Sequence, residues 1–286
     1  MKPLFINLIL LFLVSNLLAA SMSSVYPDQA SPQQALKRAI VVGATSGIGR
    51  QVAKQLALEG YQVGLVGRRE HLLKSLSEEI VTKTYQASID VADHEIAADQ
   101  LKQLIAQMGG LDLMVVSVSS FNDVSNSVQD GRPQTWEADL KTISVEAAGF
   151  YTAATVALDF FEQQKSGHLV GISSIAALRG DARCPVYCAA KAFVSCYLES
   201  MRNKFIQNNL PIYVTDILPG WVDTEQKKFS EVPGTYWVIP AEQAARDIVD
   251  AIKNKEKVRY VAKRQQLVAW ALAICPDALY NWMGGL

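Results

Sequence analysis

The feature that most constrains the fold is a regular alternation, from residue 38 onward, of short apolar runs and longer segments of mixed polarity. The apolar runs are continuous, which is typical of strands buried on both faces of a sheet. They predict strands at Ala39–Gly43, Gln62–Gly67, Leu113–Val118, His168–Ile172, Ile212–Leu218 and Val258–Ala262. The segments between them predict helices at Ile48–Glu59, Glu70–Ile80, Ile96–Met108, Trp136–Glu162, Val186–Gln207 and Ala241–Lys253. This order predicts an α/β protein, a single-domain Rossmann fold with a doubly wound parallel sheet of about seven strands.

Composition divides the chain into an N-terminal segment (residues 1–21), a linker rich in Ser, Pro and Gln (residues 22–36) and a domain (residues 37–286). In the first segment Lys2 precedes an apolar stretch that ends in small residues, as in a secretory signal peptide. Residues 3–20 also have about the minimum length of a membrane-spanning helix. A third interpretation is that Met22 is the true start. The sequence leaves all three open.

The composition excludes some classes of partner and site. Hydrophobic residues make up 50% of the 286 residues, charged residues make up 19%, and the formal net charge is −1. Because there is no excess of cations to neutralise phosphates, a nucleic-acid partner is not expected. The four cysteines lack the paired spacing of a zinc site and the three histidines are scattered, so no metal site is expected.

A glycine-rich turn joins the first expected strand to the first expected helix. Glycines let a backbone turn tightly and approach a phosphate closely, and a helix N-terminus adds N–H groups and a partial positive charge. A turn of this kind directly after the first strand predicts a dinucleotide site. The expected binding residues are Gly43, Thr45, Ser46, Gly47, Ile48 and Gly49.

The end of the second expected strand bears on the choice of dinucleotide. In NAD sites an acidic residue at this point binds the ribose hydroxyls. Here the strand ends in Gly67 and is followed by Arg68 and Arg69, with no acid. A guanidinium can bind the ribose 2′-phosphate through two parallel hydrogen bonds. The two arginines therefore predict NADP(H) as the cofactor.

Tyr187 and Lys191 are spaced i, i+4 and would share one face of a helix. A free tyrosine has a pKa near 10 (about three units above neutrality), and a nearby ammonium group lowers that pKa because it favours the phenolate. Ser174, at the end of an expected buried strand, can donate a hydrogen bond to a substrate oxygen as charge develops on it. We expect these three residues to be catalytic.

Together these motifs resemble the short-chain dehydrogenase/reductase family, from about residue 37 to about residue 265. The resemblance rests on the glycine spacing, on Asp90-Val91, on the Y-x-x-x-K motif from Tyr187 to Lys191 with Ser174 before it, and on Pro219-Gly220-Trp221-Val222-Asp223-Thr224. All of these motifs stand in the family's order. The resemblance implies an NADP(H)-dependent enzyme that interconverts a carbonyl and an alcohol by hydride transfer. By analogy it also implies a homo-oligomer.

The resemblance also assigns roles at the cofactor. It places Asp90 and Val91 beside the adenine ring, and it places Lys191, with Tyr187, at the nicotinamide ribose. The residues that it assigns to the nicotinamide end are Pro219, Gly220, Val222 and Thr224.

Two places depart from the family's pattern. Residues 116–119 are Val-Ser-Val-Ser where the family has Asn-Asn-Ala-Gly, and Glu146 stands where the family has a catalytic Asn. That Asn holds, through its backbone, a water that links the lysine to solvent, and the backbone role could survive the change. A carboxylate could also pair with Lys191 and alter its pull on Tyr187. We hypothesise that activity persists with a shifted pH profile. The alternative is an NADP-binding regulatory or scaffold protein with little catalytic activity.

Two segments bear on the substrate side. Residues 225–239, aromatic and interrupted by Pro233-Gly234, are expected to be a flexible cover for an apolar carbonyl or alcohol substrate. The apolar C-terminal tail could close the pocket, form a dimer contact or lie on a membrane, and residues 3–20 offer a second route to a membrane. Because NADP(H) is held inside cells, we expect a cytoplasmic-facing domain, anchored or not, rather than a secreted one.

Overall fold

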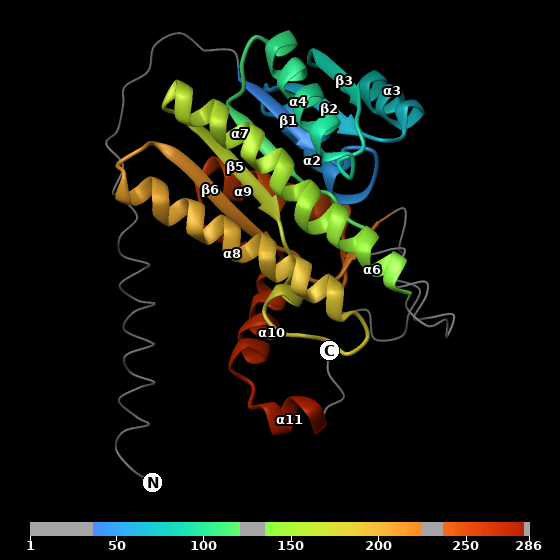
Figure 1. Cartoon of the computed structure of the whole chain (residues 1–286), viewed down its shortest axis with the longest axis vertical. Coiled ribbons are helices and arrows are strands. Elements are labelled where there is room, and N and C mark those ends of the chain that lie inside the picture. Colours follow the sequence, from blue (N-terminus) through green and yellow to red (C-terminus); the bar gives the residue numbers. More distant parts are fainter. Residues whose placement is uncertain (1–36, 121–134, 225–236, 283–286) are drawn as a thin grey trace. The chain divides into compact units, whose positions relative to one another are not determined.

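The continuous apolar runs form one parallel sheet in the computed structural model of the protein, which describes residues 37–120, 135–224 and 237–282. Seven strands pair in the order β3-β2-β1-β4-β5-β6-β9 (Figure 1). They are β1 Arg38–Val42, β2 Gln62–Gly67, β3 Thr84–Ser88, β4 Leu113–Val116, β5 Gly167–Ile172, β6 Ile212–Leu218 and β9 Val258–Tyr260. The order runs outward from β1 in both directions, so the β1/β4 pair is the topological switch point, where ligands bind beyond the carboxyl ends of the strands.

Helices cover both faces of this sheet (Figure 1). On one face lie α2 Gly47–Leu58, α3 Glu70–Glu79 and α9 Ala241–Lys253. On the other lie α4 His94–Met108, α7 Phe150–Gln164 and α8 Pro185–Gln207. The predicted fold class, a doubly wound α/β sheet of about seven strands, is therefore confirmed.

The central strand shows why the apolar runs are continuous. Ala39 and Val41 of β1 belong to the core under α2 and α9, whereas Ile40 and Val42 belong to the core under α4 and α7. Successive side chains of a strand point to opposite faces, so a strand covered on both faces needs apolar residues at every position. Burying each of the larger side chains, those of Ile40, Val41 and Val42, contributes about 1.5–3 kcal/mol.

Three strands differ from the prediction by more than one residue, and one of them, β9, ends at Tyr260 instead of the expected Ala262. The edge strand β3 is not among the apolar runs, because it pairs on one side only and its residues alternate between half-buried and exposed. Strand β4 ends at Val116, two residues before the expected Val118. The main chain continues beside β1 for one further hydrogen bond, from Ser117 N to Val42 O at 2.8 Å.

The prediction of a single helix over Trp136–Glu162 is wrong in the middle of that range. The structure has α6 (Trp136–Thr142), a π-helical segment (Ile143–Gly149) and then α7. A π segment widens the helix by one residue per turn and is frequent at functional sites. Gly149 ends it at a close approach to the chain after β3, because a Cβ on Gly149 would lie 2.7 Å from Val91 Cγ2.

The remaining described elements lie near the carboxyl edge or in the tail. They are the 3₁₀ turn Ile175–Ala177, the two-residue strands β7 Val222–Asp223 and β8 Ile239–Pro240, and helices α10 Lys263–Ile274 and α11 Asp277–Trp282. These elements belong to one compact unit, Leu36–Leu286. The predicted segments 1–21 and 22–36 and most of the predicted cover, residues 225–236, lie outside the described residues. Within the described ranges no helix is long and apolar enough to cross a membrane.

Candidate active site at the carboxyl edge of the sheet

The glycine-rich turn that follows β1 is packed too closely for side chains. Gly43 has φ +92°, and a Cβ there would overlap the main-chain oxygen of Ser117. Gly49, in the first turn of α2, would place a Cβ onto the main-chain oxygen of Gly43. Gly47 has φ +55°, and its Cβ would lie 3.1 Å from Thr224 Cγ2. The turn thus brings the N-terminus of α2 to the carboxyl edge, between the chain after β4 and the chain after β7.

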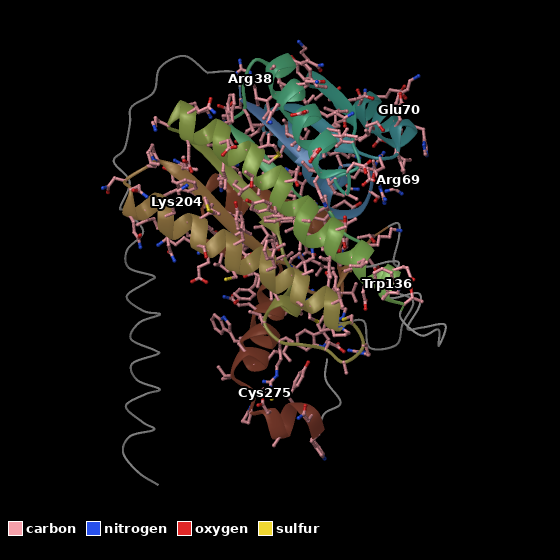
Figure 2. The ribbon with its side chains drawn as sticks, in the orientation of Figure 1. Arg38, Arg69, Glu70, Trp136, Lys204 and Cys275 are labelled. Carbon is pink, nitrogen blue, oxygen red and sulfur yellow. The ribbon has the colours of Figure 1, made fainter. Side chains whose placement is uncertain are left out.

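Two arginines follow β2 beside this turn. Arg69 Nη2 donates hydrogen bonds to Thr45 Oγ1 (2.7 Å) and Ser46 Oγ (2.6 Å). Figure 2 labels Arg69 at the start of α3. Arg68 is exposed, and its Nη1 lies 3.6 Å from a carboxylate oxygen of Asp90. The edge of the turn is therefore lined with hydroxyl groups and positive charge, a combination that suits phosphate oxygens. The close backbone, the helix N-terminus and these side chains fit a dinucleotide.

Strand β5 and helix α8 bring the three predicted catalytic residues together. Ser174 follows β5 and caps the 3₁₀ turn, its Oγ accepting a hydrogen bond from Ala176 N at 3.1 Å. Tyr187 and Lys191 lie on α8, which has Pro185 in its first turn. The side chains of Ser174 and Tyr187 are hydrogen-bonded to each other. Lys191 Nζ lies 5.7 Å from the centre of the Tyr187 ring.

Glu146, the residue in the family's Asn position, lies against Lys191. Its Oε2 is 2.6 Å from Lys191 Nζ, and the side chains are 0% and 3% exposed. Its Oε1 accepts hydrogen bonds from Ser120 N (2.6 Å) and Ser119 Oγ (3.0 Å). The π-helical segment carries Glu146, so the irregular stretch of the predicted helix is the part that reaches the site. The hypothesis that this carboxylate pairs with the lysine agrees with this geometry.

The electrostatics of the site act on the phenol of Tyr187. Burial raises the pKa of Tyr187 well above its usual value, and the negative charge of Glu146 raises that pKa further. The hydrogen bond with Ser174 acts in the opposite direction. The sequence alone suggested a lowered pKa from the nearby ammonium, but in the structure the ammonium is already paired with Glu146.

The loop after β6 closes the opposite side of the site. Ile175 N donates to Pro219 O at 2.9 Å, which ties this loop to the chain that carries Ser174. Beyond Gly220 the chain forms β7, where Val222 is buried and pairs with Ile239. Thr224 follows and lies against Gly47 of the glycine turn. The residues predicted for the two ends of a dinucleotide therefore line one continuous edge.

One residue that holds this loop was missed by the sequence analysis. Gln265, on α10, is fully buried. Its Oε1 accepts a hydrogen bond from Gly220 N (3.0 Å), and its Nε2 donates to Trp221 O (3.0 Å) and Trp237 O (2.7 Å). No motif marks a glutamine forty-five residues beyond its partner. Gln265 lies in a polar run, Lys263–Gln266, just before the apolar tail, and nothing in that run distinguishes it.

Replacing Gln265 with leucine should destabilise the loop at similar side-chain volume. Each lost hydrogen bond contributes about 1 kcal/mol and leaves a main-chain group unpaired, so the free energy of unfolding should fall by about 2–4 kcal/mol. Thermal unfolding measures this, with Gln266→Leu as the control because Gln266 is half-buried next to it on α10. Equal unfolding temperatures for the two variants would show that Gln265 does not hold the loop.

The C-terminal tail packs on this side of the protein. Tyr280 of α11 donates a hydrogen bond from its hydroxyl to Gly180 O at 2.9 Å. Arg179 forms an ion pair with Asp277 at 2.5 Å. Both contacts hold α11 to the loop between Ser174 and α8. The three roles open for the tail, closing the pocket, a dimer contact and a membrane contact, stay predictions.

Comparisons with known proteins agree with this geometry. The sequence family described as short chain dehydrogenase matches residues 37–232. A protein of Staphylococcus epidermidis named as an uncharacterized oxidoreductase is 29% identical over 76% of this chain and 89% of its own length. A similarly named protein of Myxococcus xanthus is 31% identical over 70% of this chain and 78% of its own length.

Solved structures show the same fold at lower identity. Acetoin dehydrogenase from Salmonella typhimurium has a TM-score of 0.65 and 19% identity, covering 79% of this chain and 94% of its own. ElxO, solved with NADP bound, has a TM-score of 0.65 and 20% identity, covering 79% of this chain and 97% of its own.

Proposed function

Because the chain belongs to the short-chain dehydrogenase family and is an oxidoreductase, we propose that it interconverts a carbonyl and an alcohol by hydride transfer with NADP(H). The observation that carries this proposal is the convergence of Ser174, Tyr187 and Lys191 beside the glycine turn, at the switch point of the sheet. A cofactor bound along this edge would have its phosphates at the turn and its nicotinamide near the loop after β6.

The nicotinamide cofactor supplies the hydride when bound. The chain supplies the rest of the chemistry. The Tyr187 hydroxyl donates its proton to the carbonyl oxygen as negative charge develops there, and takes a proton back from the alcohol in the reverse direction. The Ser174 hydroxyl, hydrogen-bonded to Tyr187, is placed to donate to the same oxygen. Lys191, on the same face of α8, holds positive charge beneath the phenol ring.

The preference for NADP(H) rests on the chain after β2. Strand β2 does not end in a carboxylate, and Arg69 donates hydrogen bonds to the hydroxyls of Thr45 and Ser46. A ribose 2′-phosphate at this point would meet two guanidinium groups, from Arg68 and Arg69. Charge-assisted hydrogen bonds of this kind contribute about 1.5–3 kcal/mol each.

The double variant Arg68→Ala/Arg69→Ala should lose this preference. We expect its affinity for NADPH to fall by about 100-fold or more, with the affinity for NADH changed less than about threefold, because only NADPH carries the 2′-phosphate. Titration calorimetry with each cofactor measures both. Lys74→Ala, which removes an exposed cation from α3, is the matched charge control. An equal loss for NADH and NADPH would contradict a phosphate-specific role.

The substrate is proposed to be apolar next to its reacting group. Ile175, which follows Ser174, packs in a small apolar cluster with Leu218 and Ala269, and Leu178 and Trp221 lie against it. This cluster joins the chain after Ser174 to α10, which carries Ala269. Because NADP(H) is held inside cells, we also propose that the domain faces the cytoplasm.

The buried Glu146–Lys191 pair favours a second candidate, an NADP-binding regulatory or scaffold protein with little activity. A panel of ketones and aldehydes tested with NADPH decides between the two. The enzyme hypothesis expects turnover that Tyr187→Phe abolishes. Equal background rates for the parent and the variant, together with retained NADPH binding, would favour the regulatory role.

A further inference from the structure

The ammonium group of Lys191 makes one ion pair and two hydrogen bonds with protein groups. A lysine ammonium has three N–H donors. Its Nζ lies 2.6 Å from Glu146 Oε2, 3.1 Å from the main-chain oxygen of Ile172 and 3.4 Å from that of Val118. The acceptors come from the π-helical segment and from the ends of two strands. Lys191 is therefore held in place by protein groups and paired with a carboxylate.

Glu146 is itself fixed on its other side. Its Oε1 accepts from Ser120 N and Ser119 Oγ, and Ser120 Oγ lies 3.4 Å away. Ser119 belongs to residues 116–119, the stretch after β4 that departs from the family's pattern, and Ser120 follows it. The two departures are therefore in contact, because the hydroxyl of Ser119 donates to the carboxylate of Glu146. A buried carboxylate that has an ammonium on one oxygen and N–H and O–H donors on the other satisfies the requirement for a buried charge.

Several other ionisable groups lie on the elements around Tyr187. On β6, packed against α8, Asp216 is buried and accepts hydrogen bonds from Ser173 Oγ (2.5 Å) and Ser195 Oγ (2.6 Å). On α8 itself, Cys184 and Cys188 flank Tyr187, and both add to the rise in its pKa. The 3₁₀ turn Ile175–Ala177 has no ionisable residue. Other ionisable groups on the packed elements include Glu137, Asp139 and Lys141 of α6, Asp159 and Glu162 of α7, and His168 of β5, whose Nε2 is hydrogen-bonded to Thr215 Oγ1. Glu199, Arg202 and Lys204 lie on α8, and Lys204 pairs with Glu162. Just before α8, Asp181 and Arg183 form an ion pair with each other.

We propose that Glu146 is a positioning residue that keeps the Tyr187 hydroxyl protonated by neutralising Lys191, so that carbonyl reduction keeps its proton donor well into the alkaline range. This inference rests on the proposed function for its consequence in catalysis. The equilibrium of the reaction is unchanged, because a catalyst cannot alter it. What changes is the pH at which Tyr187 passes from acid to base.

The direction in which the pH profiles should move follows from what reduction and oxidation each require of Tyr187. Reduction needs the phenol, so its rate is constant at lower pH and falls above the pKa of Tyr187. Oxidation needs the phenolate, so its rate rises with pH up to that pKa. Removing the charge of Glu146 leaves Lys191 as an uncompensated cation near the phenol, which lowers the pKa of Tyr187. Both limbs should then move to lower pH together.

The test uses Glu146→Gln, which removes the charge and keeps the shape and an acceptor oxygen for the serines. We expect the falling limb of reduction and the rising limb of oxidation, followed as kcat/KM against pH, each to move down by about one pH unit or more. Glu162→Gln is the matched control, because Glu162 forms an ion pair of the same length, 2.6 Å, with Lys204 on the protein surface. Its profiles should overlay those of the parent.

A second measurement requires neither cofactor nor turnover. The near-ultraviolet absorbance of tyrosinate, titrated in the parent and in Tyr187→Phe, gives the ionisation of Tyr187 as a difference. In the parent, Tyr187 should ionise above the usual tyrosine pKa of about 10. In the Glu146→Gln background, the difference between Glu146→Gln and Glu146→Gln/Tyr187→Phe should show a lower pKa for Tyr187 than in the parent. Ionisation of Tyr187 in the parent below that usual value would overturn the proposal even if the glutamine variant did not fold.

The outcomes separate this inference from the proposed function. Overlaid pH profiles and titrations for the parent and Glu146→Gln would overturn the role of Glu146 and leave the oxidoreductase activity standing. Absence of turnover on the whole substrate panel, with the expected titration of Tyr187, would remove the proposed reaction but support the effect of Glu146 on the phenol.

Discussion

Tyr187→Phe should lower kcat for carbonyl reduction by about 10²–10⁴-fold, the usual contribution of a positioned proton donor. The substitution removes one hydroxyl and keeps the ring that Lys191 contacts. The fold and the affinity for the cofactor should therefore stay as in the parent. Steady-state kinetics, cofactor titration and thermal unfolding of the same preparation measure the three quantities.

Tyr197→Phe is the matched control for this variant. Tyr197 lies on the same helix, and its ring stacks on Phe193 with ring centres 6.1 Å apart, away from the catalytic hydroxyls. Removing the Tyr197 hydroxyl should change kcat less than about twofold. If Tyr187→Phe kept more than about a tenth of the parent's kcat, the phenol would not be the proton donor, since a tenfold effect is only about 1.4 kcal/mol in the barrier.

The second large effect is expected for Gly43→Ala. A residue with a Cβ at φ +92° costs about 1–2 kcal/mol, and overlap with the main-chain oxygen of Ser117 adds about 1–3 kcal/mol. Because Ser117 is bound to β1 through its N–H, the sheet cannot move aside. We expect the free energy of unfolding to fall by about 3–5 kcal/mol and the affinity for NADPH to fall by about 100-fold or more, since the turn would no longer admit a phosphate.

Gly60→Ala separates the two causes. Gly60 has a similar φ, +85°, but a Cβ there would meet nothing within 4 Å. This control should lose only about 1 kcal/mol in stability, with no effect on NADPH. Denaturant unfolding and cofactor titration of both variants measure the difference. Equal losses at Gly43 and Gly60 would mean that the close approach to Ser117 contributes nothing.

The sequence predicted the elements whose causes are local. Residues 39–42 of β1 are each buried on one face or the other, so the apolar run was continuous and visible. Strand β3 was not visible as such a run, because an edge strand is covered less and can carry Thr, Gln and Ser. The π-helical segment was missed for a different reason. Its residues, Ile143–Gly149, have ordinary helical periodicity in sequence, and the widened turn depends on what the segment packs against.

The candidate site divides in the same way. Tyr187 and Lys191 are one helical turn apart, so their common face followed from spacing alone. The loop after β6 depends on Gln265, which lies far along the chain and on a different element. Hydrogen bonds between distant segments have no periodic signature, so only the folded chain could show this one.

By itself, the sequence determined the order of strands and helices, the glycine turn and the pair of Tyr187 and Lys191, because each depends on neighbours within a few residues. The tertiary structure decided the electrostatic environment of that pair, which sets the pKa of Tyr187. Glu146 lies forty-five residues before Lys191 in sequence, yet its carboxylate is 2.6 Å from the ammonium in the interior, where charges interact strongly. A pKa depends on burial and on the nearest charges in space, so the rise at Tyr187 appears only when α8, the π-helical segment and the end of β4 come together.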